Sequence, residues 1–205
     1  MKGWVLTYFK YKDCLSTALK PAPMPHLPVV LILAAGRGER FTASGGTTHK
    51  LQALLAGKRV VDHVLDAVRA SGLPHYLVEP DATRPGMGDS IAAGVKATPG
   101  APGWLVLPAD LPLIRSDTLR TIALAPGAAV TVPVYLGQRG HPVRFAATCL
   151  QELLDLKGNQ GAWQIIRGRA AIDSVAYVDV DDIGTVTDID TLEDLYRAEK
   201  LLAQR

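Results

Sequence analysis

The sequence predicts an α/β fold with a mainly parallel sheet flanked by helices. The apolar runs at 29–33 and 104–107 show no alternation with polar residues, which is typical of parallel strands covered on both faces. Segments with helical periodicity separate such runs, as in βαβ units. A chain of 205 residues with 48% hydrophobic content suffices for one sizeable domain. Ligands of such a sheet bind at the carboxyl ends of its strands.

The elements follow in order along the chain. After the strand at 29–33, apolar residues from Val60 to Val68 mark one face of a helix that ends at Ser71, because Gly72 supplies a left-handed cap. Further strands are expected at 75–78, 104–107, 129–135, 142–145 and 174–180. Further helices are expected at 91–96 with Asp89 or Ser90 as N-cap, at 116–125, 148–156 and 161–166, and from Thr191 onward. The hairpin around 136–140 is the expected departure from parallel order.

Residues 1–28 are predicted to form an N-terminal extension, and residues 29–205 the domain. Four prolines favour an extended segment with few contacts of its own: Pro21, Pro23, Pro25 and Pro28. Deletion of residues 1–23 is therefore expected to leave activity and stability nearly unchanged. An ordered arm that packs on a neighbour is the alternative, because four aromatic side chains are costly to expose to water: Trp4, Tyr8, Phe9 and Tyr11.

Composition excludes several classes of function. The 22 basic and 20 acidic residues form no block of like charge, so nucleic acid is not an expected partner. Cys14 and Cys149 lack metal-ligand spacing and are expected to be reduced thiols, which places the protein in the cytoplasm. No apolar run reaches the ~20 residues of a membrane span, so no membrane association is expected.

The loop after the first strand has the composition of an anion-binding site. It reads Leu33-Ala34-Ala35-Gly36-Arg37-Gly38, and Arg40 and Lys50 follow. Small residues leave main-chain N–H groups accessible to phosphate oxygens. Arg40 offers a planar fork for those oxygens, and Lys50 a mobile point charge.

Two common phosphate-binding motifs do not fit this loop. No segment has the glycine and Gly-Lys-Ser/Thr spacing of a P-loop. A dinucleotide fingerprint requires a third glycine, but Gly36-Arg37-Gly38 is followed by Glu39-Arg40-Phe41, and no acidic residue ends a second strand about 20 residues later.

Asp110 is the second candidate for chemistry. It follows the apolar run 104–107 and lies between Pro108 and Pro112, where a carboxylate serves no packing purpose. Mg²⁺ takes only one or two protein carboxylates and fills its other positions with phosphate oxygens and water. Asp110 is therefore a candidate metal ligand, and a turn or cap before Pro112 is the alternative.

These motifs together resemble those of a known enzyme family. The Leu-Ala-Ala-Gly loop, the Arg40-Phe41 pair and Lys50 are similar to the signature of nucleotidyltransferases with a Rossmann-like fold. Within that family the chain most resembles the molybdenum cofactor cytidylyltransferases and the related molybdopterin-guanine dinucleotide synthases. The resemblance extends from residue 29 to about 200, with one departure: the eight residues between Phe41 and Lys50 exceed the family's usual spacer.

The resemblance implies roles for the nucleotide side of a site. Arg40 and Lys50 would hold the triphosphate together with the loop Leu33–Gly38, and Asp110 would hold Mg²⁺. In the late segment Asp188-Ile189-Asp190, Asp188 is the favoured second ligand, and Asp190 is either a ligand or an orienting residue. Gly88 and Ser90 match the family loop that contacts base and ribose, although Ser90 also reads as a plain helix cap.

Two further segments resemble the family's acceptor side. Gly140-His141-Pro142 matches a Gly-His-Pro segment near the acceptor, and without the resemblance a lone histidine on a hairpin would be unremarkable. Gly158-Asn159-Gln160-Gly161-Ala162 matches Gly-Asp-x-Gly-Ala, with Asn159 in place of Asp and Trp163 where Arg is common. His141 and Asn159 are therefore expected to bind the acceptor.

The implied activity is Mg²⁺-dependent transfer of CMP or GMP from CTP or GTP to a phosphorylated acceptor, with release of pyrophosphate. The implied acceptor is molybdopterin, and a molybdoenzyme or its chaperone is the implied protein partner. CTP is favoured, because Ala35 stands where the guanylyltransferases tend to have glycine.

Three rival functions remain at this point. A glycosyltransferase would carry its Asp-x-Asp after a central strand, whereas Asp188-Ile189-Asp190 lies near the C-terminus. A nucleotidyltransferase for a sugar phosphate or another small phosphorylated acceptor would share the nucleotide loop. A non-catalytic nucleotide or cofactor carrier is the third alternative, because Asn159 and the long spacer depart from the family pattern.

Overall fold

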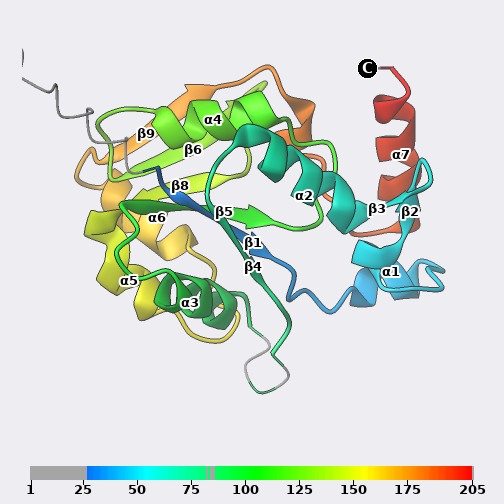
Figure 1. Ribbon diagram of the computed structural model, residues 1–205, viewed down its shortest axis with the longest axis horizontal. Coiled ribbons are helices and arrows are strands. Elements are labelled where there is room, and N and C mark those ends of the chain that lie inside the picture. Colours follow the sequence, from blue (N-terminus) through cyan, green and yellow to red (C-terminus); the bar gives the residue numbers. More distant parts are fainter. Residues whose placement is uncertain (1–26, 82, 84–85, 205) are drawn as a thin grey trace, which may run out of the picture.

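The computed structural model describes residues 27–81, 83 and 86–204 (Figure 1). The predicted N-terminal extension lies almost wholly outside the described residues, so the predictions made for it stay untested. In the described part, one central sheet is covered by helices on both faces, as Figure 1 shows. This is the mixed α/β single-domain fold that the sequence predicts.

The central sheet has seven strands in the order β4-β1-β5-β8-β6-β7, and β9 pairs with β6. The strands are β1 (Val29–Leu33), β4 (His75–Val78), β5 (Gly103–Pro108), β6 (Val130–Tyr135), β7 (Gln138–Arg139), β8 (Val143–Ala146) and β9 (Val175–Asp179). Both β4 and β5 run parallel to β1, and β9 runs parallel to β6. Because β8 is antiparallel to both β5 and β6, these two strands share one direction. Only β7 and β8 are reversed, so the sheet is mainly parallel and its departure is the predicted hairpin.

Helices on both faces explain why the strands read as continuous apolar runs. On one face, Val30 and Ile32 of β1 pack with α2 (Val60–Ser71) and α4 (Ser116–Leu124). On the other face, Leu31 and Leu33 pack with α3 (Met87–Ala97), α5 (Leu150–Leu154) and α6 (Trp163–Ala170). Successive side chains of a strand point to opposite faces, so both sets must be apolar.

The remaining elements lie mainly beyond one end of the sheet, on the right in Figure 1. They are α1 (Glu39–Ala43), η1 (Lys50–Gln52), β2 (Leu54–Leu55), β3 (Lys58–Arg59) and α7 (Leu192–Leu202). Four of these elements, α1, η1, β2 and β3, come next after β1 in the chain. There are two further 3-10 helices among the described residues. One is η2 (Ala147–Cys149), directly after β8, and the other is η3 (Ile183–Thr185), between β9 and α7.

Two predicted helix ends are confirmed, and one prediction is wrong. Gly72 caps α2 with a φ of 68°, and Thr191 forms a capping box with Asp194 at the start of α7. Neither Asp89 nor Ser90 is the N-cap of α3, because the helix already begins at Met87 behind Gly86. Ser90 lies in the first turn, where its Oγ donates to the Gly86 carbonyl at 3.0 Å.

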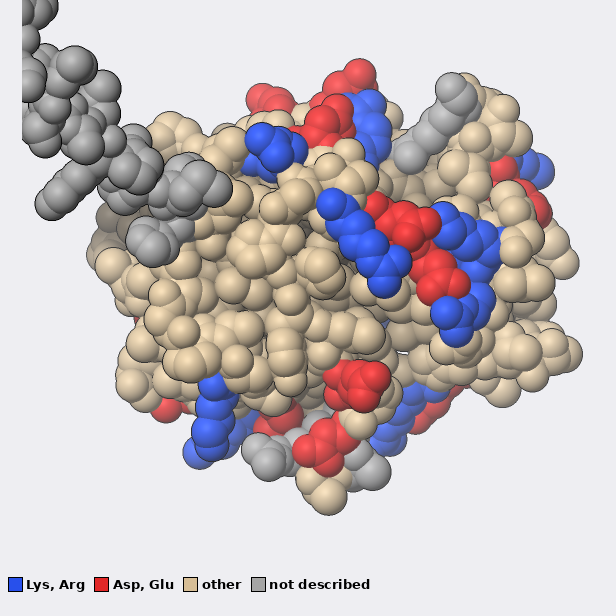
Figure 2. All heavy atoms as spheres, viewed as in Figure 1, with Lys and Arg blue, Asp and Glu red and all other residues tan. Residues whose placement is uncertain are grey.

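Charges on the visible face are mixed in sign. Figure 2 shows blue and red spheres side by side over α2 and β3. Three ion pairs belong to this region: Lys58–Asp66, Arg59–Asp62 and Arg69–Asp66. Cys149 is a buried free thiol. None of the helices in the described residues is long and apolar enough to cross a membrane.

Candidate active site

A cleft of about 650 Å³ opens at the carboxyl ends of β1 and β5. Its size is typical of small-molecule sites. Most of the predicted site residues line it: Leu33, Ala35, Gly36, Arg37, Gly38, Arg40, Lys50, Ser90, Asp110, His141, Asn159 and Asp188. Ala34 and Gly88 are not among the residues that line it. Ala34 is buried in the core. A Cβ on Gly88 would approach the backbone of Lys157 and Gln160, so this glycine serves close packing.

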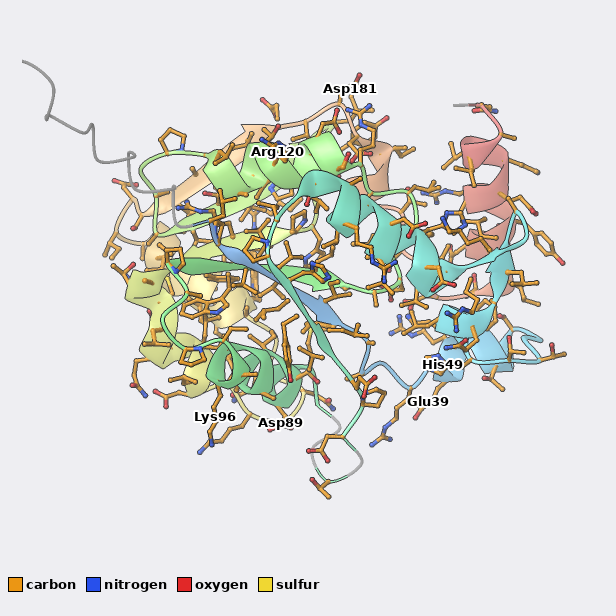
Figure 3. All side chains as sticks on the ribbon, in the orientation of Figure 1. Glu39, His49, Asp89, Lys96, Arg120 and Asp181 are labelled. Atoms are coloured by element: carbon orange, nitrogen blue, oxygen red, sulfur yellow. The ribbon has the colours of Figure 1, made fainter. Side chains whose placement is uncertain are left out.

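The loop after β1 is held by backbone and side-chain hydrogen bonds. The Ala34 N–H donates to the Val78 carbonyl at 3.0 Å, and Gly38 starts α1 with a φ of 68°, which favours glycine. His49 bonds Gly36 through Nε2 (2.8 Å to the carbonyl oxygen), while its Nδ1 accepts from the Leu51 N–H. In this arrangement Nε2 carries the proton donated to Gly36, and Nδ1 is the acceptor. In Figure 3, His49 and Glu39 lie close to the start of α1.

The long spacer after Phe41 folds into a compact turn that delivers Lys50 to the cleft. Gly46 lies so close to Phe41 that an added Cβ would come within 2.3 Å of the ring. Lys50, only 8% exposed, donates from Nζ to Asp110 Oδ2 at 2.6 Å and to Asp190 Oδ1 at 2.7 Å. The extra spacer length is thus compatible with a lysine in the centre of the site.

Backbone pairing brings the two acidic segments together. The Ala109 N–H donates to the Leu33 carbonyl at 3.0 Å, so Asp110 directly follows the β1–β5 pairing. The Ile189 N–H donates to the Asp110 carbonyl at 2.9 Å, and the Ile189 side chain is fully buried. Asp188 and Asp190 flank this anchor and both line the cleft, although the segment is not part of a strand.

Lys50 and its partners form a charge-balanced cluster. Burial acts to lower the pKa of Lys50, but the charges and hydrogen bonds of Asp110 and Asp190 outweigh it and raise that pKa. The hydrogen bond from Lys50 holds the pKa of Asp190 below its usual range. Arg40 also donates to Asp190, at 3.0 Å. The lysine is therefore cationic at neutral pH.

Asp110 and Asp188 have the features of divalent-cation ligands. Asp110 Oδ1 is buried and has no hydrogen-bond partner among the described residues. Desolvation within the cleft raises the pKa of Asp188, and the charges of Asp110 and Asp190 add to this effect. The described residues contain no group of three or more His, Cys, Asp or Glu side chains arranged for a metal ion. Mg²⁺ needs only one or two carboxylates, so the pair fits that ion.

A second set of side chains lines the part of the cleft that follows β7. Gly140 packs against Thr185, and the His141 N–H donates to the Thr185 carbonyl at 2.9 Å. Burial lowers the pKa of His141 despite the charges of Asp110 and Asp188, and its buried Nδ1 lacks a partner among the described residues. The His141 ring is therefore neutral and offers an unused nitrogen.

Three residues of the site were missed or undervalued from the sequence. Asp190, predicted as a ligand or an orienting residue, is an ion-pair partner of both Lys50 and Arg40, which the sequence did not indicate. His49 fastens the spacer to the glycine loop, and its position one residue before Lys50 was the available signal. Arg139 also lines the cleft, and it lies directly before the Gly-His-Pro segment.

The fold and the cleft define a nucleotidyltransferase. The chain belongs to the family of the MobA-like NTP transferase domain, which matches residues 70–176. The purine catabolism protein PucB of Bacillus subtilis is 29% identical over 197 residues, covering 83% of this chain and 94% of that protein.

Solved structures show the same fold. Rv0371c of Mycobacterium tuberculosis has a TM-score of 0.68 at 25% identity, covering 84% of this chain and 98% of that one. The manganese complex of the same protein has a TM-score of 0.65 at 23% identity, covering 85% of this chain and 98% of that one. A nucleotidyl transferase from Methanothermobacter has a TM-score of 0.72 at 19% identity, covering 87% of this chain and 98% of that one. CMP:2-keto-3-deoxy-manno-octonic acid synthetase, complexed with CTP, has a TM-score of 0.60 at 14% identity, covering 86% of this chain and 98% of that one.

Proposed function

We propose that this nucleotidyltransferase moves CMP from CTP to a phosphorylated acceptor, molybdopterin, with the help of Mg²⁺ and with release of pyrophosphate. The observation that carries the proposal is the cluster in which Lys50 joins Asp110 and Asp190 beside the glycine loop. A cleft with phosphate-binding amides and a carboxylate pair suits a nucleoside triphosphate and its metal ion.

The triphosphate would lie along the loop after β1. Residues of this loop line the cleft together with Arg40 and Lys50, and the N–H groups of the loop would bind phosphate oxygens. Lys50 would retain Asp190 as a partner while it turns toward phosphate oxygens, because it already divides its hydrogen bonds between two carboxylates. Its buried charge is then available to the triphosphate without a new desolvation cost.

The transfer itself requires little covalent help from the protein. An oxygen of the acceptor phosphate attacks the α-phosphorus of CTP, a new P–O bond forms, and the bond to the oxygen that bridges to the β-phosphate breaks. The electron pair leaves with pyrophosphate. Because the attacking phosphate is already anionic at neutral pH, no strong general base is needed, and positioning and charge neutralisation suffice.

Asp110 and Asp188 would hold the metal ion. A divalent cation there would neutralise charge on the phosphoryl oxygens. The unpartnered Asp110 Oδ1 and the raised pKa of Asp188 support this assignment within the described residues. The manganese complex of Rv0371c, a protein of the same fold, agrees with a divalent ion in this class.

Preference for CTP over GTP rests on Ala35. Of the two alanines in the loop, Ala35 lines the cleft and Ala34 is buried in the core. A methyl group at the cleft surface removes space and narrows the available backbone angles, which penalises a purine more than a pyrimidine. One methyl group is worth about 1–3 kcal/mol, so a preference of about 10- to 200-fold is expected.

The acceptor would bind beside His141 and Asn159. Both line the cleft, as does Arg139. Molybdopterin is proposed because the chain belongs to the MobA-like family. A molybdoenzyme or its chaperone would then receive the product.

A pyrophosphate-release assay tests this function. Purified protein is incubated with Mg²⁺, purified molybdopterin and either CTP or GTP. Release that needs both CTP and molybdopterin supports the proposal, and Asp181→Asn is the matched control because Asp181 is exposed and, in Figure 3, lies far from His49 and Glu39. Pyrophosphate release with another phosphorylated acceptor but not with molybdopterin would show that molybdopterin is not the acceptor. Nucleotide binding without release under any of these conditions would indicate a carrier.

A further inference from the structure

Arg139, at the end of β7, is held at the cleft by two aromatic rings. Its guanidinium carbon lies 5.1 Å from the ring centre of Trp163 and 5.0 Å from that of Tyr177. Trp163 begins α6 and Tyr177 lies on β9, so three separate segments meet at this point. Both rings are about half exposed. Contact with ring faces restricts the otherwise flexible arginine without consuming its N–H donors.

Arg139 also differs in charge pairing from the other basic side chains of the cleft. Those side chains all pair with carboxylates: Arg37 with Glu39, Arg40 with Asp190, and Lys50 with both Asp110 and Asp190. Within the part of the chain that the structure describes, Arg139 has no carboxylate within 4.0 Å. An exposed arginine that contacts two rings and has no counter-ion among the described residues is suited to an anionic ligand at the cleft.

The proposed reaction needs such a cation on the acceptor side. An anionic phosphate that approaches a bound triphosphate is repelled by it, and the repulsion is strongest where water is excluded. Arg139 is adjacent in sequence to the Gly140-His141 segment, which places it on the proposed acceptor wall. A planar guanidinium can give two parallel N–H bonds to phosphate oxygens and so fix the direction of attack.

We propose that Arg139 binds the attacking phosphate of the acceptor, and that Trp163 and Tyr177 are positioning residues that hold its guanidinium in place. This inference rests on the proposed function and adds to it a specific acceptor subsite. It also explains how the chain uses Trp163 where the resembled family commonly has arginine: the cation comes from β7, and the tryptophan supports it.

Steady-state kinetics of Arg139→Gln tests the subsite. The KM for molybdopterin is expected to rise about 10- to 100-fold, since a charge-assisted bidentate contact is lost. The KM for CTP should stay within about twofold, because the nucleotide residues are untouched. Arg139→Lys should fall in between, as it keeps the charge and loses the fork. The matched control is Arg69→Gln, which removes an exposed arginine on α2 and should change neither value.

The positioning residues give a second readout. Trp163→Ala and Tyr177→Ala should each raise the KM for molybdopterin about 2- to 5-fold, while Trp163→Phe and Tyr177→Phe should restore most of the loss. In the Arg139→Gln background, Trp163→Ala should have no further effect on this KM. A full additional loss there would show that Trp163 acts by itself and would overturn its positioning role.

A binding experiment separates this inference from the proposed function. Inorganic phosphate is titrated into protein saturated with Mg²⁺ and a non-hydrolysable CTP analogue, and the part of the tryptophan emission that Trp163→Phe removes is followed. Acetate is titrated in parallel to distinguish phosphate from carboxylate preference. If phosphate changes the Trp163 emission and Arg139→Gln abolishes this change, the subsite is supported. This holds even if molybdopterin is not turned over, because that result would contradict only the proposed acceptor. Turnover of molybdopterin with an unchanged KM in Arg139→Gln would overturn the subsite and leave the proposed function standing.

Discussion

The two walls of the cleft differ in how they manage charge. On the proposed nucleotide wall, Lys50 and Arg40 are already paired with Asp110 and Asp190. On the proposed acceptor wall, Arg139 rests on aromatic rings and His141 keeps a buried nitrogen without a partner in the described residues. One wall is preassembled around its own counter-ions, whereas the other leaves hydrogen-bonding capacity unused. We infer that the first wall suits the triphosphate, which all donor nucleotides share, and that the second confers specificity for the acceptor.

Asp110→Asn should break this comparison most strongly. The change removes one charge from the proposed metal site while Lys50 keeps Asp190 as a partner, so the protein should still fold. Loss of metal affinity should lower turnover by more than about 100-fold, because such charge is worth several kcal/mol in the transition state. Pyrophosphate release measures turnover, and circular dichroism checks folding. Turnover within threefold of wild type, with the same Mg²⁺ dependence, would remove Asp110 from the site.

Ala35→Gly should sharpen the account of the nucleotide wall. If the Ala35 methyl group discriminates against the purine, its removal should raise kcat/KM for GTP relative to CTP by about 10-fold or more. Ala34→Gly is the matched control, because Ala34 is buried outside the cleft and should not change the ratio. Equal kcat/KM values for the two nucleotides in the wild type would refute the cytidylyl preference and leave nucleotidyl transfer intact.

Gly86→Ala should disturb the acceptor wall through packing. A Cβ on Gly86 would lie 2.1 Å from the Gly158 backbone, so the loop that carries Asn159 must move. Overpacking of this kind costs about 1–3 kcal/mol, and thermal unfolding should show it. Gly168→Ala is the control, since that exposed helical glycine has open space around it and alanine should add up to about 1 kcal/mol. An unshifted melting temperature in Gly86→Ala would show that the loop tolerates displacement.

Asp188→Asn should have the smallest effect on the free protein, and it should be stabilising. Because the folded-state pKa of Asp188 is raised, its negative charge at neutral pH disfavours the folded state, and asparagine removes that cost. The carboxylate is exposed to the cleft, so the gain should be only about 1–2 °C in Tm. The gain should vanish as the pH falls from above the raised pKa to below the ordinary value of 3.8, because the carboxyl is then protonated in both states. A lower Tm at neutral pH would contradict this, and Mg²⁺ should bind the variant more weakly.

The sequence predicts well which residues around β1 line the cleft, because the signals for them are local. A buried strand that ends in small residues, and an aspartate between prolines after another strand, each indicate a site at the same edge of the sheet. The bond between Lys50 and Asp190 spans 140 residues, and no local pattern predicts it. The position of Ser90 was misjudged for the same reason, since the close approach of Gly86 to Gly158 accompanies an earlier start of α3. Arg139 was overlooked because its aromatic partners come from two distant elements.

Transfer of label from CTP carrying ³²P at the α-phosphate tests the central claim most directly. The protein is incubated with this CTP, Mg²⁺ and molybdopterin, and the acceptor and the pyrophosphate are quantified together. The account predicts that label enters the acceptor in step with pyrophosphate release, and that Asp110→Asn abolishes both. Labelled CMP released free in solution, or pyrophosphate formed at the same rate without acceptor, would contradict the claim that this cleft transfers a nucleoside monophosphate to a phosphorylated acceptor.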